Sequence, residues 1–322
     1  MASLSAYRNE IKGLAILWVV FFHMQLGLTG PVAALQQIGY GGVDIFFFLS
    51  GFGLYTSLQK TTRGYLARRA RRLLPAYWPF CALWLLVMIP LNHLGLGQAV
   101  KTVLGNGLML GYFFNAPLMI NWYVSALAAS VLLAPALFWL LTRRPRLWPV
   151  WLALCFAVAL PFLGQNQMMA VSRLPVFLLG MVFAMKEKEP ARGLMAGAAL
   201  ALAAGLTLLA ACFRQWPDKL IAWGGYWYPF CLIAPALCLL TGRLFARFLP
   251  EGCAFLRRLG EGSFEIFLFN VWLEWLMKKQ WQLQSPWLWL LAGLVSVAAG
   301  MAYHRAVLKM EKIFCQSQTK SR

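Results

Sequence analysis

Two apolar stretches, IKGLAILWVVFFH (11–23) and GGVDIFFFLSGF (41–52), decide the fold, and each contains polar groups that hydrocarbon does not solvate. A buried imidazole or carboxylate in a membrane usually faces the bundle interior or a wet cavity and has a function there. Lys12 and His23 are eleven residues apart, which in a helix is a turn of about 1,100°, about 20° beyond three full turns. The two side chains therefore share one helix face, about 16 Å apart along the axis. A cation near one surface and a base deeper in the membrane indicate a reaction path across the bilayer.

The composition is that of an integral membrane protein. Of 322 residues, 61% are hydrophobic and 12% are charged, whereas soluble domains have about 25% charged residues. The first apolar stretch lacks the small-residue cleavage site of a signal peptide, so we expect it to be retained as a helix. The seven cysteines are scattered singly without CxxC or zinc-ligand spacing, so we expect neither disulfides nor a metal site.

The charge distribution predicts an all-α, polytopic bundle of about ten transmembrane helices with both termini cytoplasmic. Each expected span is near the roughly 17–25 residues that cross a bilayer. With the amino terminus inside, 23 of the 29 Lys and Arg residues lie on the inner side and 6 on the outer side. This bias follows the positive-inside rule. It explains the net charge of +19, so no nucleic-acid-binding function is needed to account for that charge. The expected spans, within a single domain over 1–322 that ends in a polar tail at 316–322, are 9–28, 41–59, 76–94, 122–141, 147–164, 173–186, 192–212, 222–242, 262–278 and 286–304.

His23 and Asp44 are the candidate catalytic residues. A short connection makes their two helices expected neighbours, with both side chains in the outer half of the membrane. An aspartate that accepts a hydrogen bond from one imidazole nitrogen fixes the tautomer and raises the basicity of the other nitrogen. Such a histidine could deprotonate a hydroxyl as it attacks a thioester. The alternative is that His23 is a hydrogen-bonded packing residue.

An arginine-rich run follows the second span. Its four arginines are spaced by three and four residues, so a helix would present a guanidinium cluster at the cytoplasmic surface. Guanidinium groups bind phosphates well, and a nucleotide-bearing donor such as coenzyme A could be held there. Orientation of the chain and attraction to anionic lipid are the alternative explanation. The arginines are Arg68, Arg69, Arg71 and Arg72.

Other polar residues could line the site. Glu265 and Asn270 lie inside the predicted span 262–278, but their spacing of five does not place them on one stripe. Four more residues open predicted spans on the outer side and could form an outer mouth, although each alone is more often structural than catalytic. They are Asn121, Trp122, Tyr123 and Arg173.

Taken together, these segments resemble the integral-membrane acyltransferase family 3. The first match is a basic residue, ten residues and a histidine (12–23), followed by GGVDIFFFLSGF (41–52). Two overlapping RxxR patterns come next, with Pro75 and Tyr77 after them. Further matches are RLPVFLLG (173–180) and GEGSFEIFL (260–268).

The resemblance implies a ten- to eleven-helix protein that moves acyl groups onto carbohydrates and related acceptors. It implies that acyl-CoA enters from the cytoplasm, that the RxxR arginines lie near its phosphates, and that His23 is the essential catalytic group. Two positions depart from the family pattern. Lys12 replaces a frequent arginine and loses the bidentate fork, and Asn270 replaces a frequent histidine and cannot shuttle a proton.

These inferences predict a cell-membrane O-acetyltransferase that uses acetyl-CoA as co-substrate without a tightly bound cofactor. The acceptor is expected to be a hydroxyl of a surface glycan or its lipid-linked precursor. His23 would be the general base and Asp44 its orienting group, while Arg8, Lys12 and the 68–72 arginines hold the donor. The rival hypotheses are a transporter or flippase, which usually has paired halves that this chain lacks, and an inactive scaffold with a family-like sequence.

Overall fold

The computed structural model describes residues 2–187, 193–215 and 224–320, and every regular element in these ranges is a helix. The starts of the predicted spans 192–212 and 222–242, and the last two residues of the predicted tail, lie outside the described residues. The α-helices are α1 (Ala2–Ala6), α2 (Arg8–His23), α3 (Gly30–Gln37), α4 (Gly41–Lys60), α5 (Tyr65–Leu91), α6 (Leu96–Gly107), α7 (Trp122–Arg143), α8 (Trp148–Ala157), α9 (Met168–Val171), α10 (Leu174–Met185), α11 (Leu194–Gln215), α12 (Phe230–Phe248), α13 (Ala254–Glu261), α14 (Ser263–Trp275) and α15 (Pro286–Lys320).

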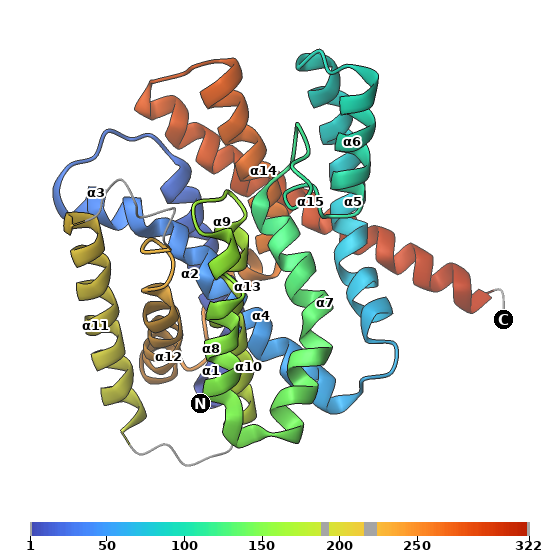
Figure 1. The fold of residues 1–322 in the computed structure, drawn as a ribbon. Helices are drawn as coiled ribbons and strands as arrows, with labels where there is room; N and C mark the ends of the chain where they lie inside the picture. The colour runs from blue at the N-terminus through green and yellow to red at the C-terminus, as the bar shows by residue number, and fades with distance from the viewer. Residues whose placement is uncertain (1, 188–192, 216–223, 321–322) are drawn as a thin grey trace.

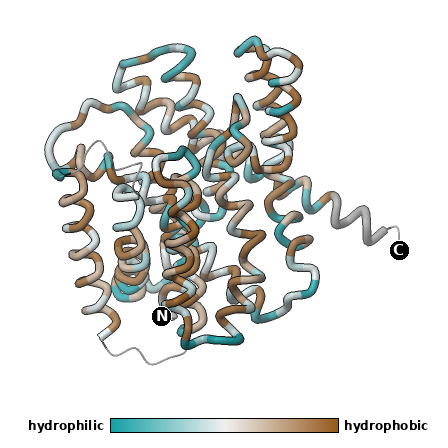
Figure 2. Tube along the Cα trace, viewed as in Figure 1, coloured by the Kyte–Doolittle hydropathy of each residue, from teal (hydrophilic) through white to brown (hydrophobic). Residues whose placement is uncertain are grey.

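The chain is a multi-pass membrane protein, as the composition predicts. Eight helical stretches of the described residues are long and apolar enough to cross a bilayer. Hydrophobic residues run along the helices, and hydrophilic residues gather at helix ends and connections (Figure 2). Helix α2, with 16 residues, and helix α14, with 13 residues, are not among these eight stretches. The number of ten spans and the location of the termini therefore remain predictions.

Several helices differ in length from the predicted spans. Predicted span 9–28 ends at His23, and the chain then turns with left-handed φ values of 64° at both Gly27 and Gly30 before α3 begins. Predicted span 76–94 begins earlier, at Tyr65, so the arginine run is part of a membrane helix. Predicted span 147–164 is interrupted after Ala157, with Pro161 in a short 3₁₀ turn.

Helix α4 lies at the centre of the bundle and packs against α10 along glycines. A Cβ placed on Gly180 would lie 2.0 Å from the carbonyl oxygen of Phe48, and one on Gly51 would lie 2.0 Å from that of Phe177. Small residues allow such close approach of membrane helices, where packing is the main force between them. The α4–α10 contact is therefore the tightly packed core on which the other helices assemble.

A second close contact joins α2, α13, α14 and α15. A Cβ on Gly260 of α13 would lie 1.8 Å from the Asn9 carbonyl oxygen of α2, and one on Gly13 would lie 2.1 Å from that of Leu256. In the same way, Gly300 of α15 packs directly on the backbone of Ile266 in α14. These glycines bring the polar residues of three helices, α2, α14 and α15, close together.

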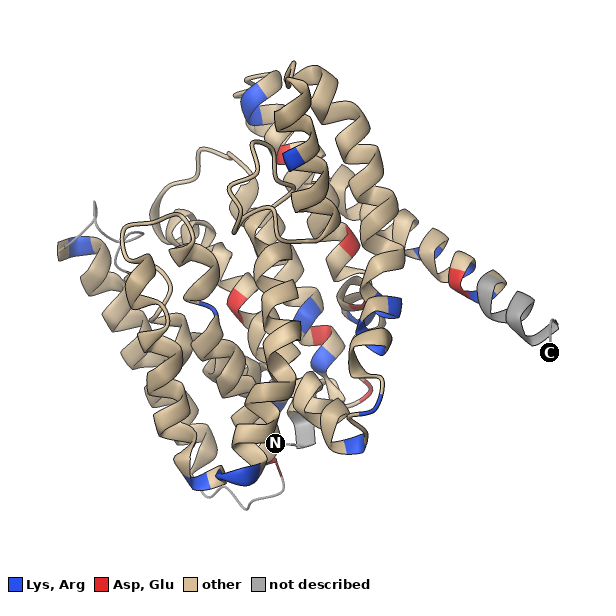
Figure 3. Cartoon of the chain, turned by 45° about the vertical axis from the view of Figure 1, so that its right-hand side comes forward, with Lys and Arg blue, Asp and Glu red and all other residues tan. Residues whose placement is uncertain are grey.

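The two ends of the bundle differ in their connections. The connection between α7 and α8 lies at the same end as the amino terminus, whereas α6 and the connection between α14 and α15 lie at the opposite end (Figure 1). Charged residues gather at the helix ends, and some lie between the helices inside the bundle (Figure 3). The buried charged residues are Glu10, Asp44, Arg173 and Glu265.

Candidate active site

His23, the last residue of α2, contacts two polar residues of α14. Its Nδ1 lies 2.5 Å from Oδ1 of Asn270, and its Nε2 lies 3.4 Å from Oε2 of Glu274. The imidazole is 14% exposed. Asn270 is in turn held by Ser296 of α15, because its Nδ2 donates to the Ser296 hydroxyl at 3.4 Å. Three helices therefore fix the imidazole at the end of the bundle opposite the amino terminus.

This network assigns the tautomer of His23. A carboxamide oxygen can only accept, so the hydrogen bond to Asn270 requires the proton on Nδ1. Nε2 of the neutral ring then carries the lone pair and is the basic nitrogen. Glu274 lies beside Nε2, and its carboxylate also binds Lys278 at 2.6 Å. A carboxyl group therefore faces the nitrogen that carries the lone pair.

A second polar pair lies between the same helices, closer to the amino-terminal end. Nδ1 of His304 on α15 is 2.9 Å from Oε1 of Glu265 on α14. Lys12 of α2 interacts electrostatically with Glu265 and Glu261. We call the set formed by Lys12, Glu265, His304, Asn270, Ser296 and His23 the polar column.

A group of cations lies at the amino-terminal end of the polar column. Lys12 interacts electrostatically with Arg8 and Arg72, and Arg69 interacts with the same two arginines. Arg69 also interacts electrostatically with Arg68, so five of the six predicted donor-binding residues are linked in this way. We call Arg8, Lys12, Arg69 and Arg72 the cation group. Arg68 also donates to the backbone carbonyls of Thr61 and Arg63, and Arg71 and Arg72 are both exposed.

Asp44 has a different partner from the one that we predicted. Its Oδ1 lies 3.4 Å from Nε of Arg173, and both side chains are almost fully buried. The guanidinium carbon of Arg173 lies 4.8 Å from the ring centre of Trp122 and 4.1 Å from that of Trp227. Three atoms of the pair, Oδ2 of Asp44 and both Nε and Nη2 of Arg173, have no hydrogen-bond partner among the described residues. The reason for the difference is that Arg173, the residue before α10, places an opposite charge beside Asp44.

The other predicted mouth residues mainly shape α7. The Asn121 side chain accepts a hydrogen bond of 2.8 Å from the backbone nitrogen of Tyr123 and so caps the helix. The Tyr123 ring is buried against Phe47 and Phe267. Trp122 reaches the predicted site only through its contact with Arg173.

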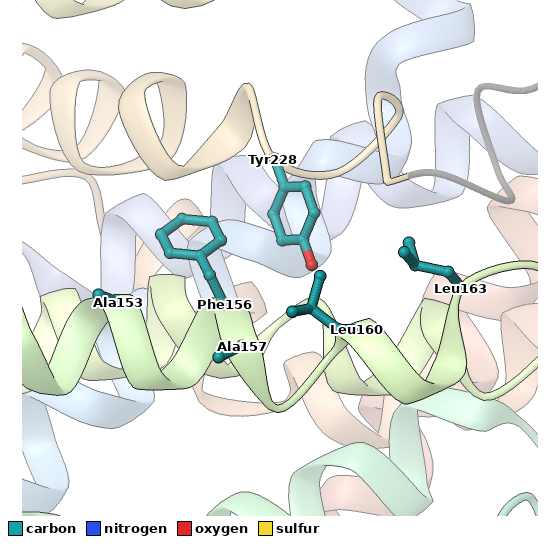
Figure 4. A pocket seen from close by; sticks show the side chains of 6 residues that line it. All are labelled: Ala153, Phe156, Ala157, Leu160, Leu163 and Tyr228. Carbon is teal, nitrogen blue, oxygen red and sulfur yellow. The ribbon is translucent and has the colours of Figure 1, made fainter.

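Two cavities in the described part of the chain differ in how they lie relative to the polar column. The larger, about 540 Å³, lies outside the polar column and is apolar, with the Tyr228 hydroxyl directed towards Leu160 (Figure 4). The smaller opens beside the catalytic candidate and has a mixed polar and aromatic wall. Its lining residues are His23, Met24, Asn270, Leu273, Glu274, Trp289, Ala292 and Gly293.

Comparison with known proteins places this geometry in a family. The model of the acyltransferase domain of acyltransferase family 3 matches residues 9–305, which include the whole polar column. The chain belongs to the acyltransferase 3 family. Neither the curated proteins nor the solved structures contain a match to the chain. For this family member, acyl transfer is the expected class of reaction, and a donor and an acceptor of acyl groups are its expected partners.

The sequence analysis missed three polar residues of this region. His304 and Ser296 lie on α15, and Glu274 lies in the last turn of α14. Eight residues in a helix turn by about 800°, about 80° beyond two full turns, so the spacing of Ser296 and His304 is only a weak sign that they share one side of a helix. Only the packing of α15 against α14 shows that both residues contact the polar column.

Proposed function

We propose that the protein is a membrane O-acyltransferase that moves an acetyl group from cytoplasmic acetyl-CoA to a hydroxyl of a cell-surface glycan or its lipid-linked precursor. It would act in the cell membrane. The observation that carries this proposal is the polar column, which joins a group of cations at one end to an imidazole of defined tautomer at the other. Membership of the acyltransferase 3 family supports the same reaction class.

The cation group supports a polyanionic donor. Arg8, Lys12, Arg69 and Arg72 are close enough for like charges to repel, and Glu261 and Glu265 offset only part of that charge. A ligand with several phosphates would remove the repulsion and form charge-assisted hydrogen bonds with the guanidinium groups. Coenzyme A has its phosphates at one end of a long arm and the sulfur at the other, which suits a site with cations at one end and a base at the other.

The chemistry proposed for His23 is general base catalysis. Its Nε2 takes the proton of the acceptor hydroxyl while the hydroxyl oxygen attacks the thioester carbonyl carbon. A carbon–oxygen bond forms, the carbon–sulfur bond breaks, and coenzyme A leaves as a thiolate. The proton on Nε2, stabilised by Glu274, then passes to the thiolate or to solvent. We now propose that Asn270 orients the imidazole of His23. Asp44 would instead have a structural role in its pair with Arg173.

The wall of the small cavity beside His23 supports a carbohydrate acceptor, but the cavity, about 10 Å³, has room for about one water molecule and would have to open to admit a sugar. Trp289 gives it an aromatic wall, and Glu274 and Asn270 give it polar groups. Binding sites commonly combine apolar or aromatic walls with a few placed polar groups that fix the orientation of the ligand. A sugar ring has an apolar face and hydroxyls on its rim, so it matches both features.

The test is acetyl transfer by membranes that contain the protein. Labelled acetyl-CoA is supplied to membranes with wild type or with His23→Ala, and label is followed into glycan, lipid and protein fractions. We expect the variant to lose transfer by a factor of about 10²–10⁴, the usual contribution of a general base. His93→Asn, which changes an exposed histidine, is the matched control and should transfer normally. Transfer that is unchanged in His23→Ala would rule out the catalytic role, and a wild type that consumes no acyl-CoA would favour a transporter or an inactive scaffold.

A further inference from the structure

The Glu265–His304 pair lies on the path between the cation group and His23 but has no part in the proposed chemistry. Asn270 is five residues beyond Glu265 on α14, which is about 7.5 Å in a helix, and Ser296 is eight residues from His304 on α15, which is about 12 Å. Because α14 and α15 are antiparallel partners here, the two contacts Glu265–His304 and Asn270–Ser296 follow one another along the polar column. The pair is therefore separated from His23 by at least one helix turn.

The pair retains unused hydrogen-bonding capacity. Nδ1 of His304 is bonded to Oε1 of Glu265, whereas Nε2 of His304 and Oε2 of Glu265 have no hydrogen bond among the described residues. The Glu265 side chain is 7% exposed and that of His304 is 16% exposed. Lys12 faces the same carboxylate from α2, and Glu261 and Glu311 are the other charged groups that act on the pair. Polar groups at this depth are costly in a membrane unless they have a partner or a ligand.

We propose that the Glu265–His304 pair binds the amide and hydroxyl groups of the arm that connects the phosphates of coenzyme A to its sulfur. This inference rests on the proposed function, because it assumes that the phosphates occupy the cation group and that the thioester reaches His23. The arm must then pass the pair, which offers both a carboxylate acceptor and an imidazole nitrogen. Amide N–H groups suit the carboxylate, and amide carbonyls suit a ring N–H.

The inference assigns Glu265 and His304 to donor binding, not to proton transfer. Hydrogen bonds to the arm would fix the distance that the thioester reaches along the polar column. Loss of the pair should therefore weaken binding of the whole donor but should not weaken binding of its nucleotide end. A purely structural role for the pair would affect both in the same proportion.

The experiment separates the two ends of the donor. Binding of labelled coenzyme A to purified wild type, His304→Leu, Glu265→Gln and Arg72→Gln is measured directly. Binding of adenosine 3′,5′-bisphosphate, which has phosphates but no arm, is measured by its direct effect on the thermal stability of each variant. His93→Asn is again the histidine control, and retention on size exclusion shows that each variant is folded.

We expect His304→Leu and Glu265→Gln to weaken coenzyme A binding about tenfold, the effect of about one lost charge-assisted hydrogen bond. Bisphosphate binding should be unchanged in His304→Leu and unchanged or tighter in Glu265→Gln, because Glu265 offsets part of the charge of Lys12. Arg72→Gln should weaken both ligands. Equal weakening of both ligands by His304→Leu, or no weakening of coenzyme A, would overturn the inference. Failure of the proposed function looks different, because wild type itself would then bind no coenzyme A.

Discussion

His23 obtains its geometry from a carboxamide rather than from a carboxylate. An oriented imidazole needs only an acceptor at Nδ1, and Oδ1 of Asn270 supplies one at 2.5 Å. The replacement of a frequent family histidine by Asn270 therefore removes a proton shuttle but keeps the orientation of the base. Glu274 places a carboxyl oxygen 3.4 Å from Nε2, on the other side of the ring.

This arrangement predicts different effects for two substitutions of Asn270. Asn270→Ala removes the acceptor, so the ring loses its fixed position, and we expect the turnover rate to fall about tenfold to a hundredfold. Asn270→Asp keeps an oxygen at the same place and should retain most of the activity. Both rates are measured at saturating acetyl-CoA on equal amounts of folded protein. An alanine variant as active as wild type would show that Asn270 does not orient the base.

The residue scale also shows what a sequence can and cannot predict here. Lys12 and His23 were recognised because both lie on one helix, where periodicity alone sets their relation. The partners of Asp44 and His23 come from segments far away in the sequence, with Arg173 immediately before α10 and Asn270 on α14. Helix neighbours could be expected from the short connection, but which turns face each other depends on the packing of side chains between helices.

At the scale of elements, glycines determine which helix faces meet. In α4 and α10 the close approach at Gly51 and Gly180 leaves no space for a side chain. The sequence marked both glycines only as parts of family-like motifs. Glycine is required at these two positions because the backbones of the two helices touch there, and no property of a single helix reveals such a contact.

Gly180→Ala should therefore destabilise the bundle. Its Cβ would lie 2.0 Å from the Phe48 carbonyl oxygen, so one of the two backbones must move. We expect a loss of about 3 kcal/mol in the free energy of unfolding, the upper part of the range typical of overpacking, seen as a lower melting temperature in detergent. Gly197→Ala on α11 is the control, because a Cβ there meets no atom within 4 Å. Equal melting temperatures for the two variants would argue against the close α4–α10 contact.

At the scale of the whole molecule, the sequence predicted the bundle class well because apolar length and charge bias are properties of composition. Eight membrane-length helices of the described residues agree with that class. The two helices that carry most of the site, α2 with 16 residues and α14 with 13 residues, are too short to be among these eight. Their polar ends, His23 and Glu274, shorten the apolar run that length rules depend on. Whether α2 and α14 cross the membrane is thus the topological question that bears on the mechanism.

Three exposed positions answer this question by cysteine labelling in intact cells. Between Arg63 and Lys279 the predicted spans cross the membrane seven times if α14 crosses and six times if it does not. Between Ser5 and Arg63 they cross twice if α2 crosses and once if it does not. The positive-inside rule therefore predicts that Ser5→Cys and Arg63→Cys face the cytoplasm, whereas Lys279→Cys faces outward.

A membrane-impermeant maleimide should label Lys279→Cys in intact cells, and it should label Ser5→Cys and Arg63→Cys only after the membrane is opened. Wild type, with its seven native cysteines, sets the background in both conditions. Labelling of Ser5→Cys in intact cells would show that α2 does not cross, and protection of Lys279→Cys would show the same for α14. Either result would leave His23 on the same side of the membrane as Lys12 and the cation group, so the proposed transfer across the membrane would have to be abandoned. With both helices crossing, the polar column connects the cytoplasmic cation group to a base at the outer face.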